Sequence, residues 1–196
     1  MAAATVMPDN LLSQPNRDFL LYVSRFEKRK NHLKLLEVFV ALVREYPKLQ
    51  LVFVGFEVDG TLAECERFIV KNGIGESVEI LSNISDSHLS NLFRAASVVV
   101  YPSLCEGFGM PIIESMLLNS HTIFSNTTAM ADFTFASENM FDPNDVDAIA
   151  EKVRSELSMK GADRPEWREQ CRFIANTYSW NRAARVLLEI HSPIEN

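Results

Sequence analysis

The 196-residue sequence contains few cysteines and histidines, and no pattern gathers them. Cys65, Cys105 and Cys171 are odd in number, far apart and without a C-x-x-C pair. This usage is typical of reduced thiols in a cytosolic protein and does not suit a disulfide framework. The four histidines are equally scattered, so the sequence predicts no zinc site and no other bound metal.

Positive charge and long apolar runs are also scarce. The formal net charge is −7, and no basic stripe is concentrated enough to favour binding of nucleic acid, which is a polyanion. The longest apolar run, residues 35–43, is interrupted by Glu37 and is far shorter than the ~20 residues that span a bilayer. The first residues lack the basic and apolar regions of a signal peptide. These absences predict a globular, cytoplasmic protein.

Short apolar runs alternate with segments of helical periodicity along the chain. Runs of the kind found in strands buried on both faces of a parallel sheet lie at 19–24, 49–54, 78–81, 97–101, 121–125 and 140–141. Helical spacing occupies 31–46, 61–72, the segment after Ser85, the segment from Pro111, 145–158, 165–177 and 180–191.

This alternation predicts the fold class. Parallel strands need helical crossovers, so the order of elements indicates an α/β fold with a single Rossmann-like, doubly wound parallel sheet and helices on both faces. We expect residues 1–17 to be a linker and residues 18–196 to form one domain that includes the C-terminal helices.

A cluster of basic residues follows the first predicted strand. Four cations lie within the six residues from Arg25 to Lys30, next to the start of a helix. Helix N-termini carry positive potential and free N–H groups, so this corner suits an anion such as a diphosphate. The alternative is a solvated basic loop, which is the commoner explanation of a charge run taken alone.

A glycine-containing loop with two carboxylates follows the fourth predicted strand. Gly107 and Gly109 allow close approach of the backbone to a ligand, and Pro111 suits the first position of a helix. Glu106 and Glu114 border this loop, and carboxylates accept hydrogen bonds from sugar or ribose hydroxyls. Taken singly, the glycines could serve only the turn and Glu114 could be only a first-turn acid. Together with the basic cluster, they indicate a binding site.

Two further segments have a structural alternative to a functional one. Residues 125–128 are small hydroxyl or amide residues after the fifth strand, and we favour helix and turn caps over ligand contacts. Asp145 and Asp147 form a D-x-D pattern, which can hold a metal ion. Here the pattern opens a helix, where acids act as caps and complement the helix dipole, so we favour capping.

The residues just described, in this order, resemble the C-terminal domain of the GT-B retaining glycosyltransferases of family four, the group that includes sucrose synthase. The central feature is E-x7-E, here Glu106 and Glu114 around Gly-Phe-Gly-Met-Pro. The segments 23–31, 141–145 and 178–180 match as well, and the resemblance covers nearly the whole chain from Phe19 onward.

The resemblance implies a role for each matching residue in binding a UDP- or GDP-sugar. Arg25 and Lys30 would bind the donor diphosphate, and with Glu106 they would form the catalytic set. Glu114 would hold the ribose hydroxyls and Glu106 the transferred sugar. The nucleobase would lie beside Asn83 and Ile84. The sugar and phosphates would face the backbone amides of Gly107, Phe108, Gly109 and Met110. Family members need neither a metal nor another cofactor.

Three departures from the family pattern limit this comparison. After the second strand the family often shows G-x-G, whereas here Phe56 and Glu57 follow Gly55. A Pro-Glu that many members carry after the fifth strand is missing. A GT-B enzyme also has two domains, so the resemblance implies a missing N-terminal domain that binds the acceptor. Peripheral association with the inner face of the cytoplasmic membrane, through that domain, is compatible with the resemblance.

Two other functions stay open at this point. The chain could be a stand-alone module that binds or senses a nucleotide sugar without catalysis. A glycosidase that uses Glu106 and Glu114 as acid and base is a weaker interpretation, because nothing nearby in the sequence would separate their pKa values. The family resemblance favours the donor-binding half of a hexosyltransferase acting in polysaccharide or glycolipid synthesis, which we expect to be inactive without its other half.

Overall fold

The computed structural model describes residues 18–159 and 164–178, so the expected linker at 1–17 and the expected helix at 180–191 lie outside the described residues. Six parallel strands form one sheet in the order β3-β2-β1-β4-β5-β6. Their bounds are β1 Phe19–Val23, β2 Gln50–Val54, β3 Val78–Leu81, β4 Val98–Tyr101, β5 Thr122–Ser125 and β6 Met140–Phe141. The predicted fold class is confirmed.

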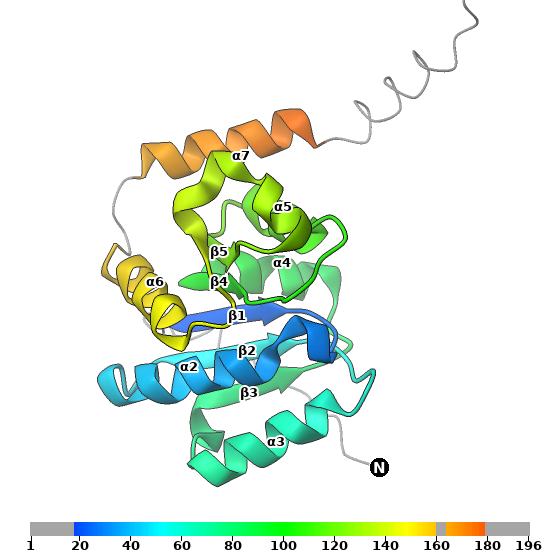
Figure 1. Cartoon of the computed structure of the whole chain (residues 1–196), viewed down its shortest axis with the longest axis vertical. Coiled ribbons are helices and arrows are strands. Elements are labelled where there is room, and N and C mark those ends of the chain that lie inside the picture. The colour runs from blue at the N-terminus through cyan, green and yellow to red at the C-terminus, as the bar shows by residue number, and fades with distance from the viewer. Residues whose placement is uncertain (1–17, 160–163, 179–196) are drawn as a thin grey trace, which may run out of the picture.

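Helices cover both faces of this sheet (Figure 1). Helix α2 packs against α3 and α6 in one layer, and α5 packs against α7 in another. The α-helices are α2 His32–Glu45, α3 Thr61–Asn72, α4 Asp86–Ala95, α5 Met110–Leu117, α6 Val146–Ser158 and α7 Pro165–Thr177. Short 3-10 helices are η1 Lys28–Lys30, η2 Gly75–Ser77, η3 Thr128–Asp132 and η4 Thr134–Asn139.

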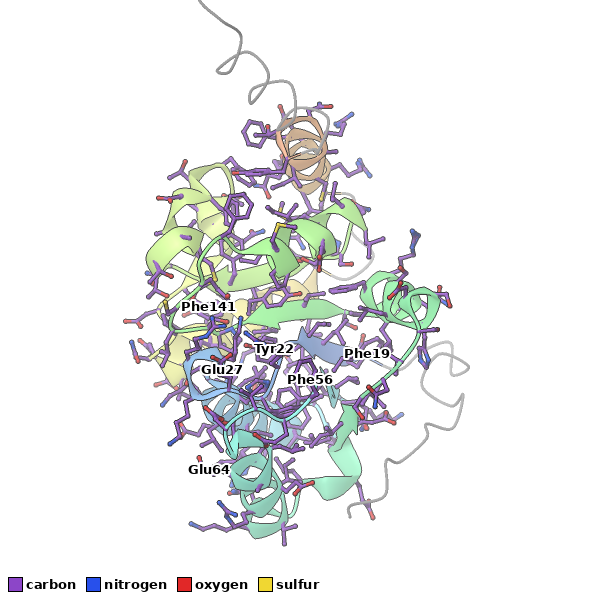
Figure 2. All side chains as sticks on the ribbon, turned by 90° about the vertical axis from the view of Figure 1, so that its right-hand side faces the viewer. Phe19, Tyr22, Glu27, Phe56, Glu64 and Phe141 are labelled. Carbon is purple, nitrogen blue, oxygen red and sulfur yellow. The ribbon has the colours of Figure 1, made fainter. Side chains whose placement is uncertain are left out.

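The strands are apolar because both of their faces are covered. All five residues of β2 are buried, as are all four residues of β4. On α2 the buried positions include Leu35, Phe39 and Leu42, a spacing that places one stripe of the helix against the sheet. Figure 2 shows Phe19 and Tyr22 of the central strand β1 within the packed interior.

Local signals in the sequence set several helix ends as predicted. Ser85 caps α4 by accepting a hydrogen bond from the backbone N–H of His88 at 3.2 Å. Gly73 ends α3 in the left-handed conformation, with φ of 66°. Asp145 caps α6 by accepting from the N–H groups of Asp147 and Ala148, both at 3.0 Å. The D-x-D pattern therefore serves as a helix cap.

Several predicted bounds differ from the structure by one residue. Ser24 follows β1, and Ser97 and His121 precede β4 and β5, although each makes a backbone hydrogen bond to the neighbouring strand. Leu49 likewise precedes β2, and α5 begins at Met110 rather than at Pro111.

Among the described residues, no helix is long and apolar enough to cross a membrane, and no cluster of three potential metal ligands was found.

The strand order determines where a ligand can bind. The chain proceeds outward from β1 through β2 to β3, and then crosses to β4 on the other side of β1. In doubly wound sheets, ligands bind at the carboxyl edge beside this reversal. The loops after β1 and β4, which carry the basic cluster and the E-x7-E pattern, meet there.

Candidate functional site

The centre of this edge is an ion pair between residues 76 positions apart. Lys30, at the end of η1, places Nζ 2.5 Å from Oε1 of Glu106 in the loop after β4. The hydroxyl of Ser103 donates to the same oxygen at 2.7 Å, and Arg29 Nη1 lies 3.5 Å from Oε2 of Glu106. The side chains of Lys30 and Glu106 are only 9% and 10% exposed, so this pair is largely shielded from solvent.

The buried hydroxyl of Tyr22 on β1 contacts both of the loops that carry this ion pair. It donates to the carbonyl oxygen of Lys30 at 2.7 Å and lies 3.3 Å from the hydroxyl of Ser103. Burial raises the pKa of Tyr22 above its ordinary value, so the phenol stays protonated and able to donate. One strand residue thus aligns the loops that carry the cation and the carboxylate.

Asn31 ties the same loops together. Its backbone adopts the left-handed conformation, with φ of 62°, where asparagine is tolerated better than most residues. Its side-chain amide donates to the carbonyl oxygens of Pro102 at 3.1 Å and Pro143 at 2.9 Å. Three loops at the carboxyl edge are therefore held by one side chain.

The two arginines of the basic cluster are paired with Glu27. Arg29 Nε lies 2.8 Å from Oε1 of Glu27, and Arg25 Nη2 lies 3.5 Å from its Oε2. The hydrogen bond from Arg29 and its charge hold the pKa of the Glu27 carboxyl below its usual range. Arg29 also donates to the carbonyl oxygen of Cys105 at 3.0 Å.

The structure adds Arg29 to the predicted site residues. Arg29 contacts Glu106 and the loop after β4, whereas the half-exposed Arg25 forms an ion pair with Glu27. The sequence signal was present, because Arg29 belongs to the run of four cations. What the run did not show was which of its members would face the second loop.

The glycine loop leads into α5 with its helix N-terminus open. Gly109 is the N-cap, with φ of 83°, and no side chain of the described residues caps the helix. A Cβ built on Gly109 would lie 2.7 Å from Cε2 of Phe133, so the loop rests directly on that ring. Phe108 is 53% exposed and packs edge-on against Tyr178, at the end of α7, with ring centroids 5.8 Å apart.

The hydroxyl residues after β5 hold this loop, so our preference for caps there was wrong. Thr127, the N-cap of η3, makes no side-chain capping bond among the described residues. The hydroxyl of Ser125 donates instead to the carbonyl oxygen of Ser103 at 2.6 Å. Thr128 accepts from the backbone N–H of Glu106 at 3.0 Å. Because the two strand ends are adjacent, bonds between loops replaced the local caps that we expected.

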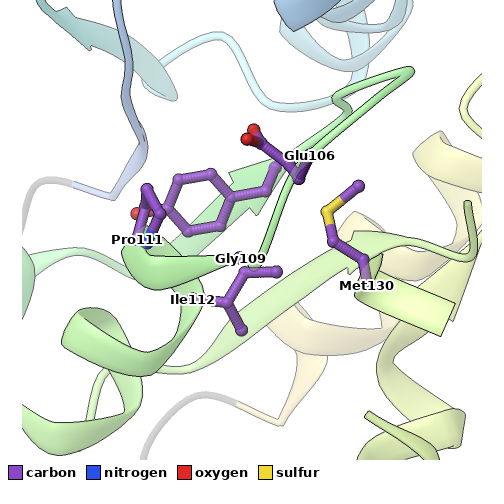
Figure 3. Close-up of a pocket in the computed structure, with 6 residues that line it drawn as sticks. Glu106, Gly109, Pro111, Ile112 and Met130 are labelled. Carbon is purple, nitrogen blue, oxygen red and sulfur yellow. The ribbon is translucent and has the colours of Figure 1, made fainter. Parts of the chain in front are cut away.

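A small hollow lies between the glycine loop and the sheet (Figure 3). The residues that line it are Tyr101, Glu106, Gly109, Pro111, Ile112 and Met130. The hydroxyl of Tyr101 is buried without a hydrogen-bond partner among the described residues, and burial raises its pKa. The hollow thus combines an apolar floor with one carboxylate and one unused hydroxyl.

Glu114 differs from Glu106 in its surroundings. It lies on α5, is exposed, and its carboxylate makes no hydrogen bond or ion pair with the described residues. Partial desolvation raises the pKa of this carboxyl above its ordinary value. Glu114 is outside the lining of the hollow, so the two glutamates of the E-x7-E pattern contact different surroundings.

The neighbouring loop after β2 closes off its own helix. The carboxylate of Glu57 accepts from the N–H groups of Gly60 and Leu62, both at 2.6 Å. Asp59 accepts from the hydroxyl of Thr61 at 2.5 Å and from the N–H of Lys28 at 3.0 Å. The N-terminus of α3 is therefore occupied by the protein's own carboxylates. Beyond it, Ile84 follows β3, is half-buried and packs against the core.

The fold places the chain in a class of proteins. The match to the structure of Anabaena HepE, crystallised with UDP and glucose, covers 95% of this chain and 51% of that one. The TM-score is 0.83 at 17% sequence identity, a level at which the likeness concerns the fold alone. The class is that of α/β proteins built like one Rossmann-like half of a GT-B glycosyltransferase.

The family follows from the sequence comparisons. The model of the family described as glycosyl transferases group 1 matches residues 5–180, so the chain belongs to that family. O-antigen chain mannosyltransferase B of Escherichia coli is 33% identical over 156 residues, which are 77% of this chain and 38% of that protein. The GDP-mannose-dependent alpha-(1-6)-phosphatidylinositol dimannoside mannosyltransferase of Mycobacterium tuberculosis is 29% identical over 178 residues, which are 89% of this chain and 44% of that protein.

These comparisons confirm the family resemblance that the E-x7-E pattern indicated. The chain spans less than half of the length of both relatives.

Proposed function

We propose that this chain is the donor-binding part of a retaining glycosyltransferase and binds a nucleoside-diphosphate sugar at the carboxyl edge of β1 and β4. The observation that carries this proposal is the meeting of Lys30, Arg29 and Glu106 beside the open N-terminus of α5. Cations and free helix N–H groups bind a diphosphate, and carboxylates bind sugar and ribose hydroxyls.

Each part of the donor has a matching group. The diphosphate lies against Lys30 and Arg29 with Arg25 at the rim, so negative charge that develops on the leaving diphosphate is stabilised without a metal. Glu106 accepts hydrogen bonds from hydroxyl groups of the transferred hexose. The carboxylate of Glu114 has no hydrogen-bond or ion-pair partner among the described residues, and it accepts hydrogen bonds from the ribose hydroxyls. Phe108 belongs to the loop whose amides face the sugar, and the base lies beside Ile84.

Both relatives described above are mannosyltransferases, so GDP-mannose is the first donor to test and UDP-glucose the second. The acceptor, a glycan or glycolipid, is held by a domain outside this chain. The chain alone binds donor but does not transfer sugar, because alignment of both substrates supplies roughly 7–11 kcal/mol of the barrier. We expect a full-length protein to retain transfer activity in the presence of a metal chelator.

Cys105 provides a direct test of donor binding. It is exposed beside Glu106, whereas Cys65 and Cys171 are buried. Burial raises the thiol pKa of Cys65 to about 12 and that of Cys171 to about 11, so alkylation at pH 8 selects Cys105. GDP-mannose or UDP-glucose should slow alkylation of Cys105, with or without chelator. Unchanged alkylation and no heat of binding for either donor would refute the proposed site.

Paired variants test the roles of the two glutamates. Glu114→Ala should weaken binding of the nucleoside diphosphate by about 1.5–3 kcal/mol, because a carboxylate that accepts ribose hydroxyls is lost. Glu106→Ala should not weaken it, since that carboxylate contacts the sugar, which GDP and UDP lack. Calorimetry with GDP and UDP measures both. Equal affinities in wild type and the two variants would contradict the assignment of the ribose to Glu114.

A further inference from the structure

The principal cation of the proposed site is neutralised by a carboxylate of the chain itself. Lys30 is 7% exposed, and its Nζ is 2.5 Å from Glu106 Oε1. Arg29 is shared between Glu27, at 2.8 Å, and Glu106, at 3.5 Å. A diphosphate therefore meets ion pairs rather than free cations.

A diphosphate and the Glu106 carboxylate compete for Lys30. Two anions drawn to one shielded ammonium repel each other, so a diphosphate that binds Lys30 closely weakens the pair between Lys30 and Glu106. The carboxylate is also held by the hydroxyl of Ser103, at 2.7 Å from the same oxygen. Close binding of the diphosphate therefore favours departure of Glu106 from Lys30, and a released carboxylate needs new hydrogen-bond donors.

We propose that Glu106 is an exchangeable counter-ion of Lys30, and that this exchange makes the site prefer an intact nucleotide sugar to the free nucleoside diphosphate. The proposal rests on the proposed function. A nucleotide sugar supplies phosphate oxygens to Lys30 and sugar hydroxyls to the released Glu106. A free nucleoside diphosphate supplies only the first, so Glu106 is left without a partner or returns to Lys30 and displaces the ligand.

This exchange has a consequence for turnover in a full-length enzyme. Once the sugar has been transferred, the bound product is a nucleoside diphosphate that gives Glu106 no hydroxyl. Re-formation of the Lys30–Glu106 pair then favours product release. Glu106 thus acts on specificity through its ion pair as well as through contact with the sugar.

The decisive experiment removes the charge of Glu106 and measures binding of three probes to the 196-residue chain: inorganic pyrophosphate, GDP and GDP-mannose, with UDP and UDP-glucose in parallel. Glu106→Gln should bind pyrophosphate and GDP about tenfold more tightly than wild type, an effect of the size of one charge-assisted hydrogen bond. Wild type should prefer the nucleotide sugar to the nucleoside diphosphate, and Glu106→Gln should lose that preference.

Glu37→Gln is the matched control. Glu37 pairs with Lys34 at 2.7 Å on the exposed surface of α2, so this variant removes one charge and one ion pair of similar length. It should change each affinity by less than about twofold, as expected for an exposed pair. A gain in Glu37→Gln equal to that in Glu106→Gln would mean that net charge alone is responsible, and would overturn the proposal.

Ser103→Ala gives a second route should Glu106→Gln fold poorly. It removes the hydroxyl that holds Glu106 but keeps all charges, and it should tighten pyrophosphate binding by about twofold to threefold. Weaker or unchanged pyrophosphate binding in both variants overturns the counter-ion role. Tighter pyrophosphate binding without binding of any nucleotide supports that role and refutes the proposed function instead.

Discussion

Two helix N-termini lie at the same edge of the sheet, and their environments are opposite. The N-terminus of α3 receives the carboxylates of Glu57 and Asp59, which accept from its backbone N–H groups. The N-terminus of α5 begins at Gly109 and has no side-chain cap among the described residues. Both ends carry the positive potential of a helix dipole, but only that of α5 is available to a ligand.

The difference teaches which strand ends form the site. Family members often carry G-x-G after the second strand, and here that position is taken by Phe56 and Glu57. Because Glu57 and Asp59 accept from the N–H groups of Gly60, Thr61 and Leu62, these groups are not free for a donor phosphate. The donor site that we propose therefore lies between the loops after β1 and β4. Figure 2 shows Glu27 and Phe56 on the neighbouring loops of this edge.

The largest expected effect comes from the close contact between the loops after β1 and β2, at Gly55. A Cβ on Gly55 would lie 1.8 Å from the carbonyl oxygen of Ser24, so Gly55→Ala must separate the loops after β1 and β2. We expect a loss of about 3 kcal/mol in the free energy of unfolding, since backbone cannot yield as a side chain does. Urea unfolding measures it. A loss below that of Gly107→Ala would show that the close approach is unimportant.

The open helix end can be disrupted at Gly109. Gly109→Ala introduces a Cβ at φ of 83° against the ring of Phe133, and should cost about 2 kcal/mol in unfolding free energy and weaken donor binding. Gly107→Ala is its control, because a Cβ at Gly107 meets no atom within 4 Å. The α3 side should be unaffected, as judged by amide exchange of residues 61–72. Equal stability of the two variants would argue against a strained loop.

Acid should weaken the β1 side through His32. This ring is 1% exposed and stacks on Phe26 with centroids 4.4 Å apart, and burial, aided by the charge of Lys30, lowers its pKa from 6.5 to about 4. Below pH 6.5 the unfolded chain binds a proton that the folded chain binds only near pH 4. Stability contributed by the neutral ring is therefore present above pH 6.5 and lost as the pH falls.

The free energy of unfolding should be about 2 kcal/mol lower at pH 5 than at pH 7.5. His32→Phe fills the same aromatic site without titrating, and neither ring nitrogen of His32 has a hydrogen-bond partner among the described residues. The variant should remove most of this pH dependence in urea unfolding. A wild-type curve that is flat between pH 7.5 and 5 would contradict the buried neutral histidine.

The smallest effect should reveal the hidden anion site of α3. Glu57→Ala removes the internal carboxylate, and should lower the unfolding free energy by about 1 kcal/mol, as loss of a helix cap does. The exposed N–H groups should then bind sulfate, so that sulfate raises the melting temperature of Glu57→Ala more than that of wild type. Ser85→Ala on α4 is a comparison for cap loss alone. An identical sulfate response in wild type and Glu57→Ala would remove the contrast between α3 and α5.

Much of the fold was predictable because its signals are local. Buried parallel strands produce continuous apolar runs, and helix ends such as Ser85 and Gly73 follow from the hydrogen bonds and backbone angles of neighbouring residues. The errors were also local in kind. Hydroxyl residues after β5 were interpreted as caps, although Ser125 and Thr128 bind the loop after β4.

The sequence by itself determined which residue types stand at the carboxyl ends of the strands: cations after β1, glycines and two carboxylates after β4, and an acid where G-x-G is often found after β2. Only the tertiary structure decided which of them meet. Lys30 and Glu106 are 76 residues apart, and their pairing depends on β1 and β4 being neighbours and on Tyr22 aligning both loops. Contacts of this kind depend on the return of the chain to β4 after it has formed α2, β2, α3, β3 and α4, which local periodicity does not encode.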